Sequence, residues 1–128
     1  MTEEEMLVHA FFLPERRSRY SEFLTSHRNR RKFFAELAHF RGLDERCKRS
    51  IPPAEQTPHG IAQMLRQTGA STSCLIISDH KEIDGTRLPI SEALATVLGR
   101  TAGTFLSCKP GRLAYFENED GRWILKRD

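Results

Sequence analysis

The sequence predicts an α+β fold, in which N-terminal helices pack on a mostly antiparallel sheet of about four or five strands with one inserted helix. Apolar residues follow a helical spacing in the first half of the chain, whereas the second half consists of short apolar runs separated by turn residues. The helical part covers about 3–68 and the sheet part about 72–127. With 38% hydrophobic and 29% charged residues, the 128 residues fit a single domain, 1–128, with one core.

The first element, within 3–13, fits either a helix or a short buried strand. Three glutamates at 3–5 suit the positive first turn of a helix dipole. The apolar run at 7–13 would also suit a buried strand. The acidic start favours the helix, in which these apolar residues share one face: Met6, Leu7, Ala10 and Phe11.

Residues 15–41 keep the i, i+3, i+4, i+7 spacing of a helix in phase for about six turns. Pro14 can open such a helix, and Gly42 is a natural residue to end it. The unbroken phase favours one long helix over the alternative of two helices that meet near 26–29. We interpret its aromatic residues as core packing: Tyr20, Phe23, Phe33, Phe34 and Phe40.

The stretch at 42–57 has little periodicity and is expected to be a connection with at most one helical turn. Thr57 and Pro58 are a strong helix start, because a hydroxyl N-cap precedes a proline at the first helical position. The predicted helix ends at Gly69 and has one apolar face, formed by Ile61, Met64, Leu65 and Thr68.

Four consecutive apolar residues, Cys74–Ile77, predict a central strand at 73–78 that is buried on both faces. Asp84-Gly85 is a tight-turn pair that could close a small hairpin between Ile83 and Leu88. The inserted helix is expected to start near Pro89 and to stop at Gly99. A meander of three strands then completes the sheet, at 104–108, 112–116 and 122–126.

Composition excludes several classes of protein. No apolar run approaches the ~20 residues of a membrane span, and the acidic N-terminus is unlike a signal peptide, so we expect a cytoplasmic protein without a membrane contact. Three widely spaced cysteines form neither a disulfide framework nor a zinc motif. The formal net charge is +3, and its excess lies in residues 1–50, where 11 Lys and Arg stand against 8 Asp and Glu. This excess is too small to indicate nucleic-acid binding by itself, but it indicates where to look for an anion site.

The run at 27–32 is the most unusual local feature. If a helix began at Ser26, these basic side chains would crowd its positive end, which is unfavourable. A continuous helix removes the conflict, whereas a real helix start would make an anion site for phosphate. The candidate anion-binding residues are Arg28, Arg30, Arg31 and Lys32, and a solvated helix face is the simpler alternative.

Asp79, His80 and Glu82 form a second candidate site, just after the central strand. Their side chains suit acid–base catalysis, but their spacing matches no known metal-ligand motif, and no metal or cofactor is predicted. A polar turn that leaves a buried strand has the same composition. The chain also lacks GxGxxG, GxxxxGK[ST], GxSxG, HExxH and CxxC motifs.

Three functions follow as hypotheses. The one that the charge distribution favours is a small cytosolic, non-enzymatic binding or regulatory domain, with a basic helical surface for an acidic protein or a nucleic acid. The first alternative is a small hydrolase or nuclease-like enzyme that uses Asp79, His80 and Glu82. The second is a homodimer, formed through the aromatic face of 20–40 or through an exposed last strand at 123–125.

Overall fold

A computed structural model describes residues 1–127, and within them the chain forms an α+β fold around one antiparallel sheet of six strands. The strand order is β1-β6-β5-β4-β2-β3. The predicted fold class is confirmed, with one strand more than expected. The strands are β1 (Lys48–Ser50), β2 (Ser73–Ser78), β3 (Arg87–Pro89), β4 (Gly103–Lys109), β5 (Leu113–Asn118) and β6 (Gly121–Lys126).

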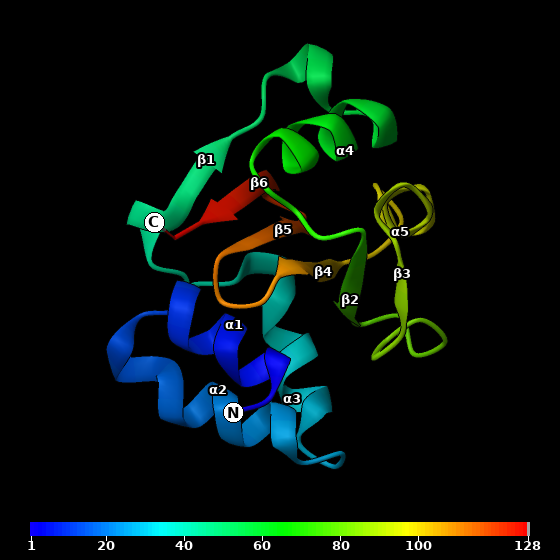
Figure 1. Ribbon diagram of the computed structural model, residues 1–128. Helices are drawn as coiled ribbons and strands as arrows, with labels where there is room; N and C mark the ends of the chain where they lie inside the picture. Colours follow the sequence, from blue (N-terminus) through cyan, green and yellow to red (C-terminus); the bar gives the residue numbers. More distant parts are fainter. Residues whose placement is uncertain (128) are drawn as a thin grey trace.

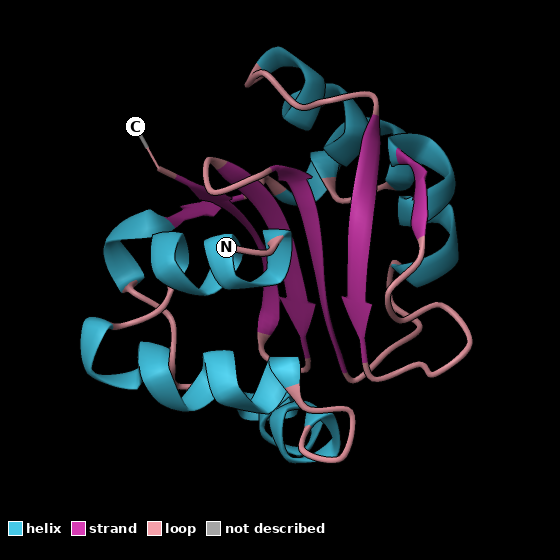
Figure 2. Cartoon of the chain, turned by 60° about the horizontal axis from the view of Figure 1, so that its bottom comes forward, coloured by secondary structure: helices cyan, strands magenta, loops and turns pink. Residues whose placement is uncertain are grey.

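Helices cover both faces of the sheet (Figures 1 and 2). The predicted N-terminal helices, α1 (Glu3–Phe11), α2 (Arg17–Thr25) and α3 (Arg30–Glu36), pack on one face, and α4 (Pro58–Gln67) and α5 (Ile90–Val97) on the other. The inserted helix α5 links β3 to β4 across β2. Strand residues alternate between the two layers, because successive side chains point to opposite faces: Ile77, Phe105 and Phe116 face the first three helices, and Ile76, Leu106 and Tyr115 face α4 and α5.

Helix α1 takes the form that the acidic start favoured, and a capping box fixes its first turn. The hydroxyl of Thr2 accepts the backbone N–H of Glu5 at 3.1 Å, and the Glu5 carboxylate accepts the backbone N–H of Thr2 at 3.0 Å. Leu7, Val8 and Phe11 are buried. The cap therefore fixes where the helix starts, and its apolar face holds it against the sheet.

The single long helix favoured over 15–41 is wrong, and the alternative of two helices is confirmed. Ser26 has an extended backbone (ψ 116°) after α2, and its carbonyl accepts the N–H groups of Asn29 and Arg30, both at 3.0 Å, as α3 begins. Tyr20 of α2 and Phe33 of α3 nevertheless enter the same aromatic cluster, with ring centroids 5.7 Å apart. The hydrophobic phase continues across the break because both helices pack on one core.

Strand β1 lies in the stretch expected to be a connection, so the sequence reading of 42–57 missed it. Its three residues, Lys-Arg-Ser, are polar, and it exists because it pairs with β6, where Lys48 lies opposite Leu125 and Ser50 opposite Trp123. The Lys48 ammonium lies 4.0 Å from the Trp123 ring centroid. The last strand is therefore covered on its outer side by β1.

The central strand β2 has the predicted bounds, with Cys74, Ile76 and Ile77 fully buried. Antiparallel pairing with β3 sets Cys74 opposite Leu88, so the hairpin forms between these two strands rather than between Ile83 and Leu88. Gly85, in the connection between them, has a φ of +81°, a conformation that side chains with a Cβ rarely adopt. No helix among residues 1–127 is both long enough and apolar enough to cross a membrane.

Candidate functional site

A pocket of about 890 Å³, here called the α3 pocket, lies between the start of helix α3 and the connection from β2 to β3. Both polar runs singled out in the sequence contribute to it, because the fold brings the end of β2 beside α3. Cavities of roughly 300–1,000 Å³ are typical of small-ligand sites. The lining residues are Glu4, His27, Arg30, Arg31, Phe34, Ala35, Ser78, Asp79, Lys81, Asp84 and Gly85.

Arg30, one of the four candidate anion-binding residues, is held by two carboxylates of the protein itself. Its Nε and Nη2 donate to Asp84 at 3.0 and 2.7 Å, and its Nη1 donates to Glu4 at 2.6 and 3.0 Å and to the Leu24 carbonyl at 3.0 Å. Burial alone would lower the pKa of Arg30, but the hydrogen bonds to Asp84 and Glu4 raise it. The charge of Arg30 is therefore neutralised inside the fold.

This ion cluster of Glu4, Arg30 and Asp84 relieves the electrostatic conflict noted for a helix that starts near Ser26, but only at Arg30. Arg30 is the first residue of α3, and carboxylates from α1 and from the β2–β3 connection lie beside it. Asp84 also accepts the backbone N–H of Ser78 at 3.1 Å, which fixes the connection to the end of β2. The cluster thus forms the inner wall of the pocket and joins the helical layer to the sheet.

The other basic residues of the run are exposed. The side chains of Arg28, Arg31 and Lys32 have no ion pair or hydrogen bond within residues 1–127, and the same is true of His27 and Lys81. Of these five, His27, Arg31 and Lys81 line the pocket, whereas Arg28 and Lys32 do not. The α3 pocket therefore presents unpaired cationic groups from two separate segments of the chain.

Asp79 is the member of the acidic cluster that lines the pocket, and His80 and Glu82 are exposed outside it. The Asp79 carboxylate accepts a hydrogen bond from the backbone N–H of Ala102 at 3.3 Å, and the Ser78 hydroxyl lies 3.5 Å from it. Both bonds are long, so the carboxylate retains capacity to accept hydrogen bonds from a ligand. Asp79 is half-buried and can be reached from the pocket.

The described residues offer little catalytic machinery. Within residues 1–127, no histidine ring is hydrogen-bonded to a serine, threonine or cysteine, and no three His, Cys, Asp or Glu side chains are grouped so that they could hold a metal ion. The hydroxyl of Ser78 is already bonded to that of Thr104 at 2.8 Å. The Asp79 carboxylate lies 3.5 Å from this hydroxyl, which is longer than the hydrogen bond by which a general base activates a nucleophile.

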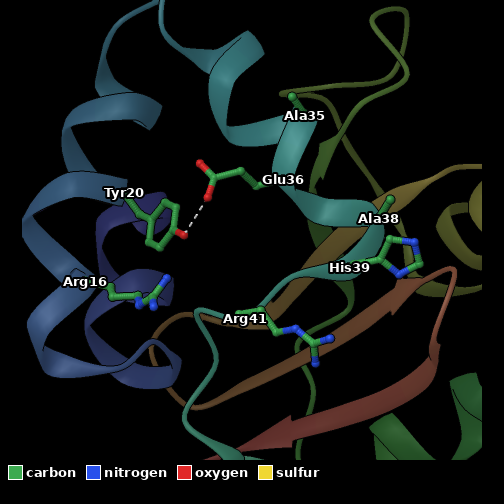
Figure 3. A pocket seen from close by; sticks show the side chains of 7 residues that line it. All are labelled: Arg16, Tyr20, Ala35, Glu36, Ala38, His39 and Arg41. Atoms are coloured by element: carbon green, nitrogen blue, oxygen red, sulfur yellow. Dashed lines mark hydrogen bonds between the residues drawn. The ribbon is translucent and has the colours of Figure 1, made fainter.

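A second pocket, of about 400 Å³, lies between α2 and the segment after α3 (Figure 3). Figure 3 shows the Tyr20 hydroxyl pointing toward Glu36, to which it donates a hydrogen bond of 3.0 Å. Arg19 also contacts Glu36 at 3.3 Å, and His39 contacts Asp120 at 2.9 Å. Because most of its polar groups have partners within the chain, this pocket is a weaker candidate for a ligand.

A buried polar row crosses four neighbouring strands on the side of α4 and α5. Ser78, Thr104, Glu117 and Arg122 are consecutive cross-strand partners, and the first three are at most 3% exposed. Glu117 accepts the Gly99 backbone N–H at 2.9 Å and the Tyr115 hydroxyl at 2.9 Å. Burial raises the pKa of Glu117 above its usual value. We interpret this row as the network that holds the loop after α5 on the sheet.

Sequence reasoning identified Arg31 and Asp79 but missed the groups that complete the site. Lys81 lay within the polar run that contained Asp79, and its unpaired charge was not weighed. Glu4 and Asp84 lie 26 and 54 positions from Arg30, so no local spacing could reveal their pairing.

No protein-family model matches this chain, and the comparisons with curated proteins and with solved structures found no match either. The function must therefore be inferred from the chemistry of the pocket itself.

Proposed function

We propose that this protein is a small cytosolic binding domain, without catalytic activity, that accepts one nucleotide of a single-stranded nucleic acid in the α3 pocket. One observation carries the proposal. Arg31 and Lys81, two cations without partners in the described part of the chain, line the same pocket as the accessible carboxylate of Asp79. A nucleotide has the matching groups, because it joins an anionic phosphate to a base with hydrogen-bond donors.

The phosphate would bind Arg31 and Lys81. Charge-assisted hydrogen bonds from guanidinium and ammonium groups to phosphate oxygens are stronger than neutral ones, and Arg31 can offer two parallel donors. Arg28 and Lys32 belong to the same basic run as Arg31 and are exposed, but they do not line the pocket. These two residues would add a longer-range attraction that salt screens readily.

The base would occupy the interior, where Asp79 accepts a donor from its edge and the half-buried ring of Phe34 offers an apolar contact. Three cations of the lining, Arg30, Arg31 and Lys81, are balanced by three carboxylates, Glu4, Asp79 and Asp84. A balanced pocket favours a ligand with an anionic group and hydrogen-bond donors over a purely acidic protein surface.

The two alternative functions receive less support. A hydrolase built on Asp79, His80 and Glu82 would need these side chains to converge, and of the three only Asp79 lines the pocket. A homodimer would need exposed apolar surface, yet β1 covers the last strand, and Tyr20, Phe33 and Phe40 are buried.

The proposal is tested by titrating the protein into a fluorescently labelled single-stranded RNA oligonucleotide and measuring anisotropy at low and moderate salt. The test variant is Arg31→Ala with Lys81→Ala. The matched control is Arg28→Ala with Lys32→Ala, which removes the same charge from side chains outside the pocket. The pocket variant should lose about tenfold or more in affinity, since one charged hydrogen bond is worth about that factor.

The control variant should lose only a few-fold, and its loss should shrink as salt rises. Equal losses in the two variants would mean that RNA binds a diffuse basic surface rather than the pocket. A duplex that binds as tightly as the single strand would contradict a site that encloses an unstacked base. No binding even at low salt, or tighter binding of an acidic peptide than of RNA, would overturn the proposal.

A further inference from the structure

A third pocket, of about 440 Å³, lies at the other end of the sheet and differs from the α3 pocket in charge. Ser78 lines the α3 pocket and pairs with Thr104, near the start of β4. Lys109 is the last residue of β4 and therefore lies at the opposite end of the strands. The described lining includes four cationic side chains and no acidic one: Thr68, Lys109, Arg112, Leu113, Lys126 and Arg127. We call it the cationic pocket. Its four formal charges exceed the net charge of +3 of the whole chain.

The backbone forces these charges together. Lys109 and Arg112 are the first and last residues of a tight turn closed by a hydrogen bond of 3.0 Å from the Arg112 N–H to the Lys109 carbonyl. Gly111 takes the positive φ of +68° that this turn requires after Pro110. The first and last residues of a β-turn lie within about 7 Å of each other between Cα atoms. Their two side chains therefore start from neighbouring positions.

The end of β6 adds the other two cations. Lys126 is the cross-strand partner of Leu113, and the Arg127 N–H donates to the Arg112 carbonyl at 2.9 Å. Like charges on neighbouring strands repel, so this arrangement of cations destabilises the folded state. Regular backbone hydrogen bonds fix the positions from which these side chains start.

Two of the four cations interact with other groups of the chain: Lys126 is one of them, and Arg127 donates to the Cys47 sulfur at 3.3 Å. Arg127 lies 3.8 Å from a carboxylate oxygen of Asp44, but Asp44 is engaged more closely by Arg46, at 2.9 and 3.1 Å. The side chains of Lys109 and Arg112 have no partner within residues 1–127. The carboxyl end of α4, at Thr68, favours a nearby cation, but the effect of a helix end is small and does not account for two unpaired cations.

We infer that the cationic pocket binds a diphosphate group, as free pyrophosphate or as part of a nucleoside diphosphate. A diphosphate carries more negative charge than orthophosphate, and it offers oxygens on two phosphorus atoms to the unpaired Lys109 and Arg112. Lysine and arginine side chains on two sides could contact both phosphoryl groups at once. No aromatic side chain among residues 1–127 lines the pocket, so a base would gain no stacking from them. This site is independent of the proposed nucleotide site, since the two share no residue.

The inference is tested by isothermal titration with inorganic pyrophosphate, with a nucleoside diphosphate and with orthophosphate, at constant ionic strength. The test variant is Lys109→Gln with Arg112→Gln, and Arg28→Gln with Lys32→Gln is the control of equal charge. Pyrophosphate should bind wild type about tenfold or more tightly than orthophosphate, because a second phosphoryl group adds charge-assisted bonds. Similar affinities for pyrophosphate and the nucleoside diphosphate would indicate that the diphosphate alone is recognised.

A second measurement guards against a folding defect. Thermal unfolding without ligand should show Lys109→Gln with Arg112→Gln at least as stable as wild type, because repulsion is relieved, while its stabilisation by pyrophosphate is lost. The control variant should keep that stabilisation. The inference is overturned if pyrophosphate does not bind wild type, or if both variants lose it equally. It is also overturned if the cationic-pocket variant loses RNA binding while pyrophosphate binding is absent, which would assign this surface to nucleic acid.

Discussion

Arg30 and Asp84, 54 positions apart in the sequence, form an ion pair with two parallel hydrogen bonds, of 3.0 and 2.7 Å. Their side chains are 14% and 17% exposed, and Glu4 completes the cluster on the other side of the guanidinium. The pair joins the first residue of α3 to the β2–β3 connection. We therefore expect this pair to hold the two walls of the α3 pocket together.

Arg30→Ala should destabilise the protein strongly, because it leaves the carboxylates of Glu4 and Asp84 beside each other without a cation. Breaking a largely buried ion pair by removing one partner costs about 3 kcal/mol or more of the free energy of unfolding. Arg30→Lys should be intermediate, since an ammonium cannot reproduce the paired hydrogen bonds. Urea unfolding monitored by circular dichroism measures the free energy of unfolding of both variants.

Arg31→Ala is the matched control, one position along the same helix. Arg31 is exposed and unpaired within the described residues, so its removal should change the free energy of unfolding by less than about 0.5 kcal/mol. If Arg30→Ala were no more destabilising than Arg31→Ala, the ion cluster would not hold the pocket walls together.

Asp44 should make the protein sensitive to acid. Hydrogen bonds from Arg46 lower the pKa of this buried carboxyl from 3.8 to about 2. Because the folded-state pKa is depressed, the stabilisation is present above the unfolded pKa and is lost as pH falls from about 4 through about 2. The difference in free energy of unfolding between wild type and Asp44→Asn should therefore shrink over this window, and a constant difference would contradict it.

Glu117 should make the protein less stable as pH rises, whereas Asp44 makes it less stable as pH falls. Burial raises its pKa above the ordinary 4.5, although the Tyr115 hydroxyl, the Gly99 N–H and Arg122 oppose the shift. Between 4.5 and the higher folded-state value the folded protein binds more protons, so this contribution to stability falls as pH rises. Glu117→Gln should remove that fall. Unfolding measured across this range in both proteins provides the check, and parallel curves would refute the assignment.

The three thiols should resist modification in the native state. Cys47, Cys74 and Cys108 are at most 2% exposed, and the sulfur atoms of Cys74 and Cys108 lie 3.1 Å apart. The hydrogen bond between these two thiols lowers the pKa of Cys74, and together with burial it raises that of Cys108. A thiol reagent should therefore react with no cysteine promptly under native conditions and with all three in denaturant. Rapid native labelling that disappears in Cys74→Ala would show an opening of the sheet beside β3.

Local signals in the sequence predicted much of the fold. Strand β2 is a continuous apolar run, and α4 follows a Thr-Pro start. The prediction of these two elements therefore needed no knowledge of distant contacts. Strand β1 could not be found in this way, because Lys48–Ser50 is polar and pairs with a strand far away in the sequence. The break at Ser26 was hidden because the residues on either side pack into one aromatic cluster.

The candidate site was predicted in two halves. Arg31 and Asp79 each stood out by composition, but the contact between α3 and the end of β2 is a tertiary feature that no spacing encodes. Arg30 resembled its neighbours in the sequence and differs from them because two distant carboxylates neutralise it. The fold therefore determines which cations of a basic run remain unpaired.

The most direct test of the proposed function is to map the ligand on the protein by ¹H–¹⁵N NMR during titration with a single-stranded RNA oligonucleotide. We predict saturable shift changes at the backbone amides of Arg31, Phe34, Asp79 and Lys81, with little change at Lys109 and Arg112. Shift changes confined to the exposed residues Arg28 and Lys32, or centred on the cationic pocket, would contradict a nucleotide site in the α3 pocket.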